Sequence, residues 1–230
     1  MDLVLGYLGS KAVNGAYQAV IANMPPHDTY IETHLGSGIV MLRKPPALRS
    51  IGLEIDPEAF ATFGAIPDVE THNVDCLAFL RTFDFASAGR VLIYADPPYV
   101  LAARARVRMQ RYRHDYSDAD HEALIALLRT LPASVMISGY HSDLYAGLLP
   151  APGWRSISYQ VNTRGGPRTE CLWMNFAASA AHWADYAGID FTDRQRIKRK
   201  AARWQRMYRD LPVGERMAVL AAVMEVGAEE

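Results

Sequence analysis

The chain has 230 residues, half of them hydrophobic and 21% charged, which is the composition of an ordinary globular protein rather than a disordered or fibrous one. Its two cysteines lie far apart and its histidines lack metal-ligand spacing, so we expect reduced thiols and no metal site. No apolar stretch has the length of a membrane span and no basic cluster precedes the first apolar residues, so we expect a cytoplasmic protein without a membrane partner.

Hydrophobic periodicity predicts alternating helices and strands along the first 176 residues. In chain order they are a helix at 12–24, strands at 30–33 and 50–55, a helix from about 57, a helix at 77–83, a strand at 91–95, a helix after 117, and strands at 134–138, 154–161 and 170–176. Pro57 suits a first helical turn, where its missing N–H is no loss. Ser117 and Asp120 form a capping box.

This order of elements predicts an α/β fold with a largely parallel sheet covered on both faces. The connection at 162–169, with Gly165-Gly166-Pro167, makes the last two strands an antiparallel hairpin at one edge. Ligands of such sheets bind beyond the carboxyl ends of the strands. The turn at Gly36 and the residue Asp96 both follow strands, so we expect the site there.

The tetrapeptide Asp96-Pro97-Pro98-Tyr99 directly follows the apolar strand at 91–95. The carboxylate of Asp96 can accept one N–H of an exocyclic amine and the carbonyl of Pro97 can accept the other. Proline removes competing N–H donors from such a loop, so it presents acceptors to the amine. Tyr99 offers a face on which a base can stack. The structural alternative is an ordinary proline-rich turn.

The turn Gly36-Ser37-Gly38 allows close approach of the backbone to a ligand. A dinucleotide site would need a third glycine where Met41 stands, which argues against a nicotinamide oxidoreductase. Glu54 ends the second strand, the position at which an acid binds ribose hydroxyls in nucleoside-binding α/β folds. Asp56 is a second candidate for this role, but a role at the N-terminus of the following helix suits it equally well.

Several segments in this order resemble the Dam-like DNA adenine methylases, specifically their short phage-type or prophage-type members. They are Tyr7-Leu8-Gly9-Ser10-Lys11, Tyr30-Ile31-Glu32-Thr33-His34-Leu35-Gly36-Ser37-Gly38, Asp96-Pro97-Pro98-Tyr99, Asp120-His121 with Leu124, Ser138-Gly139-Tyr140, and Arg168-Thr169-Glu170-Cys171-Leu172-Trp173. The resemblance covers roughly residues 1–176. It implies a class I S-adenosylmethionine-dependent methyltransferase fold and transfer of a methyl group to the N6 amine of a flipped-out adenine.

The resemblance also implies roles for individual residues. Tyr7 and Lys11 are expected to close over S-adenosylmethionine, and Asp75 is expected to bind its adenine end. Glu32, in the first-strand motif, is assigned to the same pocket. Family members acting on cytosine tend to have Ser where this chain has Asp96, and those acting on RNA or protein tend to have Asn. The alternatives are a methyltransferase for cytosine N4 or RNA adenine, and a non-catalytic DNA-binding module.

Basic residues are concentrated in two segments, although the net charge is only −1. Such asymmetry suits a phosphate-facing side, but a solvated face is the alternative, and it is the resemblance that implies double-stranded DNA as the partner. No separate recognition domain fits between Asp75 and Asp96, so the segment after Tyr99 is its expected substitute. We assign DNA binding to Arg104, Arg106, Arg108, Arg111, Tyr112, Arg113, Arg164 and Arg168. Arginine can read guanine edges or hold phosphates, and we expect phosphate contacts to predominate, with short or relaxed sequence specificity. An edge strand is the alternative for this segment.

The catalytic domain is expected at 1–187 and a helical extension at 188–230. Thr192 and Gln195 resemble a capping box for a basic helix with one apolar stripe. Leu211-Pro212 ends this helix, and a second helix is predicted at about 214–226. We interpret the pair as a helical hairpin packed on the domain. Its basic faces could track a DNA backbone, and self-association through these helices remains open.

Overall fold

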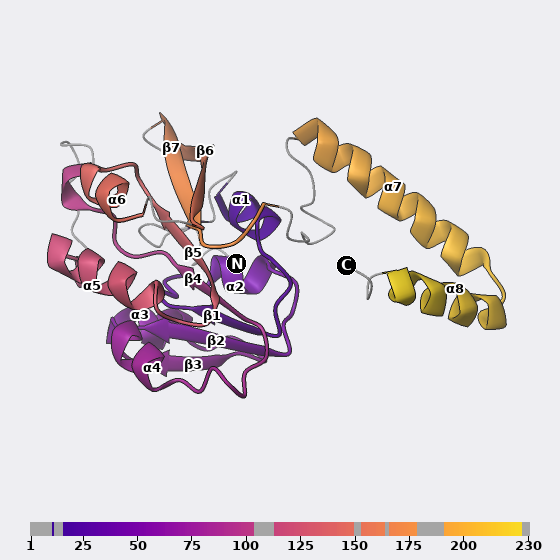
Figure 1. Cartoon of the computed structure of the whole chain (residues 1–230), viewed down its shortest axis with the longest axis horizontal. Coiled ribbons are helices and arrows are strands. Elements are labelled where there is room, and N and C mark those ends of the chain that lie inside the picture. Colours follow the sequence, from indigo (N-terminus) through magenta and orange to yellow (C-terminus); the bar gives the residue numbers. More distant parts are fainter. Residues whose placement is uncertain are drawn as a thin grey trace. The chain divides into compact units, whose positions relative to one another are not determined.

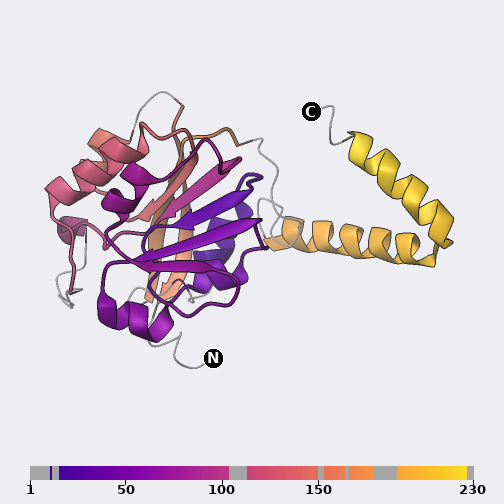
Figure 2. The same cartoon turned by 90° about the horizontal axis from the view of Figure 1, so that it is seen from below.

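The computed structural model describes residues 11, 16–103, 113–149, 153–163, 166–178 and 191–226. The chain divides into two compact units, Met1–Trp183 and Ala184–Glu230. The first contains a sheet with helices packed against it, and the second contains a pair of helices (Figures 1 and 2). All the predicted site residues that the structure describes lie in the first unit.

The first unit is built on a seven-stranded sheet with the strand order β3-β2-β1-β4-β5-β7-β6. The strands are β1 (Thr29–Glu32), β2 (Arg49–Glu54), β3 (Glu70–Asn73), β4 (Val91–Ala95), β5 (Ser134–Gly139), β6 (Arg155–Thr163) and β7 (Gly166–Met174). Strands β1 to β5 are parallel, β7 is antiparallel to β5, and β6 is antiparallel to β7. The predicted Rossmann-like sheet with an antiparallel edge hairpin is therefore confirmed, and its strand order reverses between β1 and β4.

The helices of the first unit are α1 (Ala16–Ala22), α2 (Ile39–Arg43), α3 (Pro57–Phe63), α4 (Cys76–Thr82), α5 (Asp118–Leu128) and α6 (Asp143–Leu148), with a 3₁₀ turn at Leu101–Ala103. Four of them, α3 to α6, begin at a residue whose side chain caps them. Helix α5 has the predicted capping box, in which Ser117 and Asp120 exchange hydrogen bonds with each other's backbone N–H. Pro57 is the first residue of α3, as expected. The side chain of Asp56 caps the same helix by accepting from the N–H of Glu58 at 2.9 Å.

The two faces of the sheet differ in chemistry. Odd-numbered residues of β1, β2, β4, β5 and β7 pack with α4, α5 and α6 in one apolar core, whose strand members include Ile31, Ile93 and Trp173. Figure 1 shows α1 and α2 on the other side of the sheet. Side chains alternate between faces along a strand, so the even-numbered residues point to that second side. They include the buried polar residues Glu32, Tyr94, Ser138 and Glu170.

The edge hairpin corrects one prediction. Residues 162–169 are not mainly a connection, because β6 extends to Thr163 and β7 begins at Gly166. Pro167 is accommodated because β5 pairs with β7 only from Cys171 onward, so this part of β7 has a partner on the β6 side alone. The edge strand β3 and the short helices α2 and α6 were not predicted. The β3 sequence is polar and mostly exposed and lacks the apolar signal of a strand.

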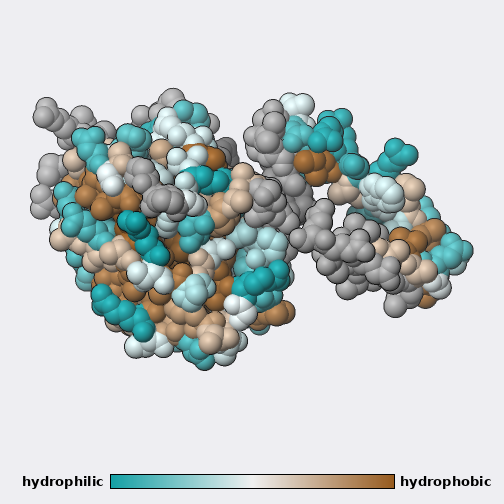
Figure 3. All heavy atoms as spheres, viewed as in Figure 1, coloured by the Kyte–Doolittle hydropathy of each residue, from teal (hydrophilic) through white to brown (hydrophobic). Residues whose placement is uncertain are grey.

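The second unit consists of α7 (Phe191–Asp210) and α8 (Val213–Val226). The helix break at Leu211-Pro212 is confirmed, but α7 begins before Thr192, so the predicted capping box is wrong. The two helices are joined by the hydroxyl of Tyr208, which donates to the carbonyl of Arg216 at 3.0 Å. Both hydrophilic and hydrophobic residues lie on the visible surface of this unit (Figure 3). No helix among the described residues is long and apolar enough to cross a membrane.

Candidate active site at the carboxyl ends of the central strands

The glycine turn after β1 needs glycine for two reasons. Gly36 and Gly38 have φ values of 49° and 65°, in the left-handed region that other residues avoid. A Cβ on Gly38 would also lie 2.7 Å from Cδ1 of Ile66. Ser37 between them is buried. Position 38 therefore requires glycine, both for its backbone conformation and for its packing against Ile66.

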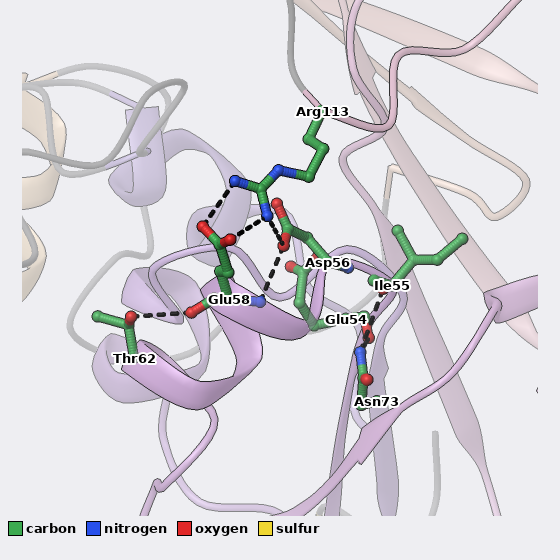
Figure 4. Close-up of polar contacts among 7 residues, drawn as sticks. All are labelled: Glu54, Ile55, Asp56, Glu58, Thr62, Asn73 and Arg113. Carbon is green, nitrogen blue, oxygen red and sulfur yellow. Dashed lines mark hydrogen bonds and ion pairs between the residues drawn. The ribbon is translucent and has the colours of Figure 1, made fainter.

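Glu54 holds this turn in place. One carboxylate oxygen accepts from the N–H of Gly36 at 2.8 Å and the other accepts from the N–H of Asp56 at 3.0 Å. The side-chain amide of Asn73 donates to the Glu54 carbonyl at 2.7 Å (Figure 4). Burial raises the pKa of Glu54, and the backbone N–H groups oppose that rise. Glu54 thus links β2 to the glycine turn, and its binding of ribose remains a prediction.

Two further acids near the cofactor motif have local structural roles. Asp56 is the N-cap of α3, which was the alternative considered for it. Asp75 is the N-cap of α4 and accepts from the N–H of Ala78 at 2.9 Å. Such a cap stabilises a helix by about 1 kcal/mol. Contact of Asp75 with an adenine ring remains a prediction.

Strands β1 and β4 stay paired up to the site. The N–H of Thr33 donates to the carbonyl of Tyr94 at 3.0 Å, just before the glycine turn on one strand and Asp96 on the other. Pro97 is buried, and Pro98 and Tyr99 are half-buried. The loop after β4 and the turn after β1 therefore begin side by side, as the sequence predicts.

Asp96 is in contact with Lys11. The Lys11 ammonium donates to Oδ1 of Asp96 at 2.8 Å and also to the hydroxyl of Tyr99. It lies 3.4 Å from Oε2 of Glu170, which in turn accepts from the hydroxyl of Tyr159 at 3.1 Å. The side chains of Lys11, Asp96 and Glu170 are only 6%, 15% and 7% exposed. By its residue type alone Lys11 would be expected at the surface, whereas here it is the centre of a buried cluster.

The charges of this cluster depend on one another. Burial alone would lower the pKa of Lys11, but the carboxylates of Asp96 and Glu170 raise it above its ordinary value. Burial raises the pKa of Asp96, and the Lys11 ammonium opposes that rise. A cation close to Asp96 therefore stabilises its carboxylate form, which is the form that can accept an N–H.

The ring of Tyr99 is held edge-on by a second aromatic residue. Tyr99 and Tyr140 have ring centroids 4.5 Å apart with planes at 70°. The Lys11 ammonium lies 4.8 Å from the centroid of the Tyr99 ring. Packing of this kind restricts the ring to one orientation, as a stacking surface for a base would need.

Glu32 belongs to a second buried polar group on the same face of the sheet. It accepts from the hydroxyl of Tyr30 at 3.1 Å, and the ammonium of Lys44 lies 4.5 Å from the centroid of the Tyr30 ring. Burial raises the pKa of Glu32 to about 8 and lowers that of Lys44 to about 8. The assignment of Glu32 to the cofactor pocket remains a prediction.

Of the predicted DNA-binding residues, the structure describes Arg113 and Arg168. The guanidinium of Arg113 lies 2.5 Å from Oε1 of Glu58 and 3.8 Å from Oδ1 of Asp56 (Figure 4). This ion pair is exposed, so a phosphate could compete for the arginine. Arg168 is half-exposed and lies near Tyr140, whose pKa it lowers against the larger effect of burial. The predictions for Tyr7, Arg104, Arg106, Arg108, Arg111, Tyr112 and Arg164 lie outside the described residues.

Sequence reasoning gave no role to Glu170 or Tyr159. A signal was present, because Glu170 is a charged residue at the start of an otherwise apolar strand segment, Glu170-Cys171-Leu172-Trp173-Met174. Its face could be assigned only once the register of β7 against β5 was known. In the described part of the chain, no cluster of three or more His, Cys, Asp or Glu residues could hold a metal ion.

No protein-family model matches the chain, and no curated protein matches its sequence. Solved structures similar to it include the O-methyltransferase TomG of Streptomyces achromogenes, with 15% identity and a TM-score of 0.47 over 74% of this chain and 84% of that one. The N-methyltransferase NodS of Bradyrhizobium japonicum WM9 has 9% identity and a TM-score of 0.46 over 70% and 93%. TrmN of Thermus thermophilus has 18% identity and a TM-score of 0.45 over 73% and 51%.

Proposed function

We propose that this chain is an S-adenosylmethionine-dependent methyltransferase that methylates the N6 amine of an adenine flipped out of double-stranded DNA. One observation carries this proposal. The carboxylate of Asp96, whose side chain is 15% exposed, lies one residue beyond β4, next to a glycine turn after β1 and at the point where the strand order reverses. An acceptor in that place suits an amino group presented to a donor bound over the turn.

The residues present fit this donor. Gly36 and Gly38 give the turn a left-handed backbone without side chains, and the carboxylate of Asp96 beside it suits the cationic sulfonium. S-adenosylmethionine, when bound, supplies a methyl group on a sulfonium that leaves as neutral S-adenosylhomocysteine. The protein contributes position, and placing two reactants in near-attack geometry is worth roughly 7–11 kcal/mol of barrier.

Asp96 would act on the amine in two ways. Its carboxylate accepts one N–H, which turns the nitrogen lone pair toward the methyl carbon. The nitrogen would gain positive charge as it takes up the methyl group, and the Asp96 carboxylate would stabilise that charge until the amine releases one proton to solvent. Tyr99 offers its ring to the flipped base, which cannot be reached while stacked in a duplex.

Double-stranded DNA is the proposed substrate because α7 is strongly basic. It carries Arg194, Arg196, Lys198, Arg199, Lys200, Arg203, Arg206 and Arg209 against two acids, Asp193 and Asp210. A helix of this charge suits phosphates and contributes affinity without sequence preference. We therefore expect short or relaxed specificity.

The test is identification of the methylated base. The purified protein is incubated with S-adenosylmethionine labelled in its methyl group and with unmethylated duplex DNA or RNA, and the products are digested to nucleosides. We expect labelled N6-methyladenine from DNA. Labelled N4-methylcytosine, or label in RNA alone, would overturn the substrate assignment, and absence of label from all nucleosides would overturn the activity.

The Asp96→Ala variant is the matched control for the chemistry. Removing one preorganised electrostatic partner typically lowers a rate by about 100- to 1000-fold. We expect a loss of this size with an unchanged circular dichroism spectrum. Near-native methylation by this variant would exclude Asp96 from the role proposed for it.

A further inference from the structure

Two carboxylates face one ammonium in the candidate active site. Lys11 Nζ lies 2.8 Å from Oδ1 of Asp96 and 3.4 Å from Oε2 of Glu170. Both acids are nearly buried, and only the first of them belongs to the tetrapeptide after β4. Burying a carboxylate is costly unless it is paired and hydrogen-bonded, so the second acid needs an explanation.

The edge hairpin holds Glu170 firmly in this place. Tyr159 of β6 stands directly opposite Glu170 of β7 in the strand register. Its hydroxyl donates to the same oxygen, Oε2, that lies near Lys11. The carboxylate is therefore oriented by a cross-strand hydrogen bond before any ligand arrives.

The proposed reaction creates a conflict at Asp96. Its carboxylate has to accept an N–H from the substrate amine, and although Oδ2 is a second acceptor, an ammonium that stays on Oδ1 withdraws charge from the whole carboxylate and weakens it as an acceptor. A neutral amine competes poorly with an ammonium for a carboxylate, because the charged donor forms the stronger hydrogen bond. If Lys11 simply left Asp96, a buried ammonium would lose its main partner. Glu170 is near enough to take it over.

We propose that Glu170 is a positioning residue that receives the Lys11 ammonium while Asp96 binds the amino group of the base. This inference rests on the proposed function. The ammonium stays paired throughout, and the charge of the cluster does not change when the amine enters. Lys11 and Glu170 act through Asp96, so neither has to touch the base.

The first test uses Glu170→Gln, which keeps the shape and a hydrogen-bond acceptor for Tyr159 but removes the charge. Lys11 then has no second carboxylate and remains on Asp96. We expect methyl transfer in a single turnover to slow by about 10- to 100-fold, the scale of a misplaced reacting group. The Kd for S-adenosylmethionine, measured by calorimetry without DNA, is expected to stay unchanged. An unchanged rate would overturn the proposal.

Two control variants separate charge from packing. Glu170→Asp retains the carboxylate and is expected to recover part of the lost rate. Tyr159→Phe removes one hydroxyl but neither charge, so it should slow transfer much less than Glu170→Gln does. If Tyr159→Phe were as slow as Glu170→Gln and Glu170→Asp recovered nothing, the packing of the hairpin rather than the second charge would be responsible.

A second readout needs neither methyl donor nor DNA. Several titratable groups interact electrostatically with Asp96. They are Lys11 and Tyr99, Tyr30 and Glu32 of β1, Tyr94 of β4, Tyr145 of α6, Tyr159 of β6 and Glu170 of β7. Burial makes the largest contribution to the raised pKa of Asp96, Lys11 opposes it, and Glu170 adds to it.

Removal of the Glu170 charge should therefore lower the pKa of Asp96, which ¹³C NMR of the aspartate carboxyls can follow. A structural role for Glu170 would leave this titration in place. An unchanged titration of Asp96 in Glu170→Gln would overturn the inference even if the protein methylates DNA. A shifted titration in a protein that methylates no nucleic acid would overturn the proposed function instead.

Discussion

At the scale of single residues, ionisable side chains are concentrated on the face of the sheet that points away from the apolar core. Glu32, Lys44, Glu170 and Lys11 are all nearly buried there. Each has hydrogen-bonding, charged or aromatic partners from other elements, as in the contact between Lys44 and Ser50 at 3.1 Å. Burying ionisable groups costs stability, so the free energy of unfolding should depend measurably on pH.

Glu32 should make the protein less stable as the pH rises. Burial raises its pKa to about 8, so between about pH 5 and 8 the folded protein keeps a proton that the unfolded chain has lost. The free energy of unfolding should then fall by up to about 1.4 kcal/mol per pH unit. Glu32→Gln should abolish this fall in urea denaturation at pH 5.5, 6.5 and 7.5.

The matched control for Glu32 is an acid at the surface. Glu70 is exposed and bonded to Arg49, which lowers its pKa, so it is ionised in both states over this range. Glu70→Gln should leave the slope of the unfolding free energy against pH, between pH 5.5 and 7.5, the same as in the native protein. Equal slopes for the native protein and Glu32→Gln would show that Glu32 is already ionised in the fold.

Gly38→Ala tests the glycine turn. The substitution combines a left-handed φ of 65° with a contact of 2.7 Å to Ile66, so we expect a loss of about 1–3 kcal/mol in unfolding free energy. Gly147→Ala is the control, because this helical position has open space and alanine favours helix there by up to about 1 kcal/mol. Denaturation midpoints that move equally for both variants would contradict the requirement for glycine at position 38.

At the scale of elements, we predict that the basic helix α7 contacts the phosphates of duplex DNA. Its 20 residues span about 30 Å, and Arg203 and Arg206 are exposed on its basic side. If they contact phosphates, changing both to Gln should weaken duplex binding and reduce the slope of log K against log salt by up to about two. Fluorescence anisotropy with a labelled duplex at several salt concentrations measures both effects.

Two arginines of the first unit provide the control for α7. Arg81 is exposed on α4 and Arg129 is exposed at the C-cap of α5, so Arg81→Gln with Arg129→Gln removes the same charge from another surface. This double variant should leave the salt slope unchanged. Equal loss of slope in the two double variants would mean that only the total charge of the protein matters.

At the scale of the whole molecule, the division into two units predicts what a truncation does. The sheet and the helices packed on it belong to Met1–Trp183, and α7 with α8 belongs to Ala184–Glu230. A chain without residues 184–230 should keep its cooperative unfolding and its affinity for S-adenosylmethionine. Its affinity for duplex DNA at low salt should fall at least about tenfold, because the basic helix is lost. Loss of cooperative unfolding would show that the second unit contributes to the fold of the first.

The order of helices and strands could be read from the sequence because it depends on local patterns. The strand at β4, the caps of α3 and α5, and the helix break at Pro212 each have a signal within a few residues. The local signal was misleading at Pro167, which suggested a loop. Pro167 lies in β7 because this part of the strand pairs only with β6 and not with β5, which the sequence does not show. The polar edge strand β3 had no local signal at all.

By itself, the sequence was sufficient to place Asp96 behind a buried strand and the glycines behind another, because parallel strands bring such loops to the same edge of a sheet. Only the tertiary structure decided what surrounds Asp96. Lys11 is 85 residues away along the chain, and Glu170 faces the site only through the register of β7 against β5. Contacts at that separation depend on the packing of the whole sheet, which no local pattern of residues encodes.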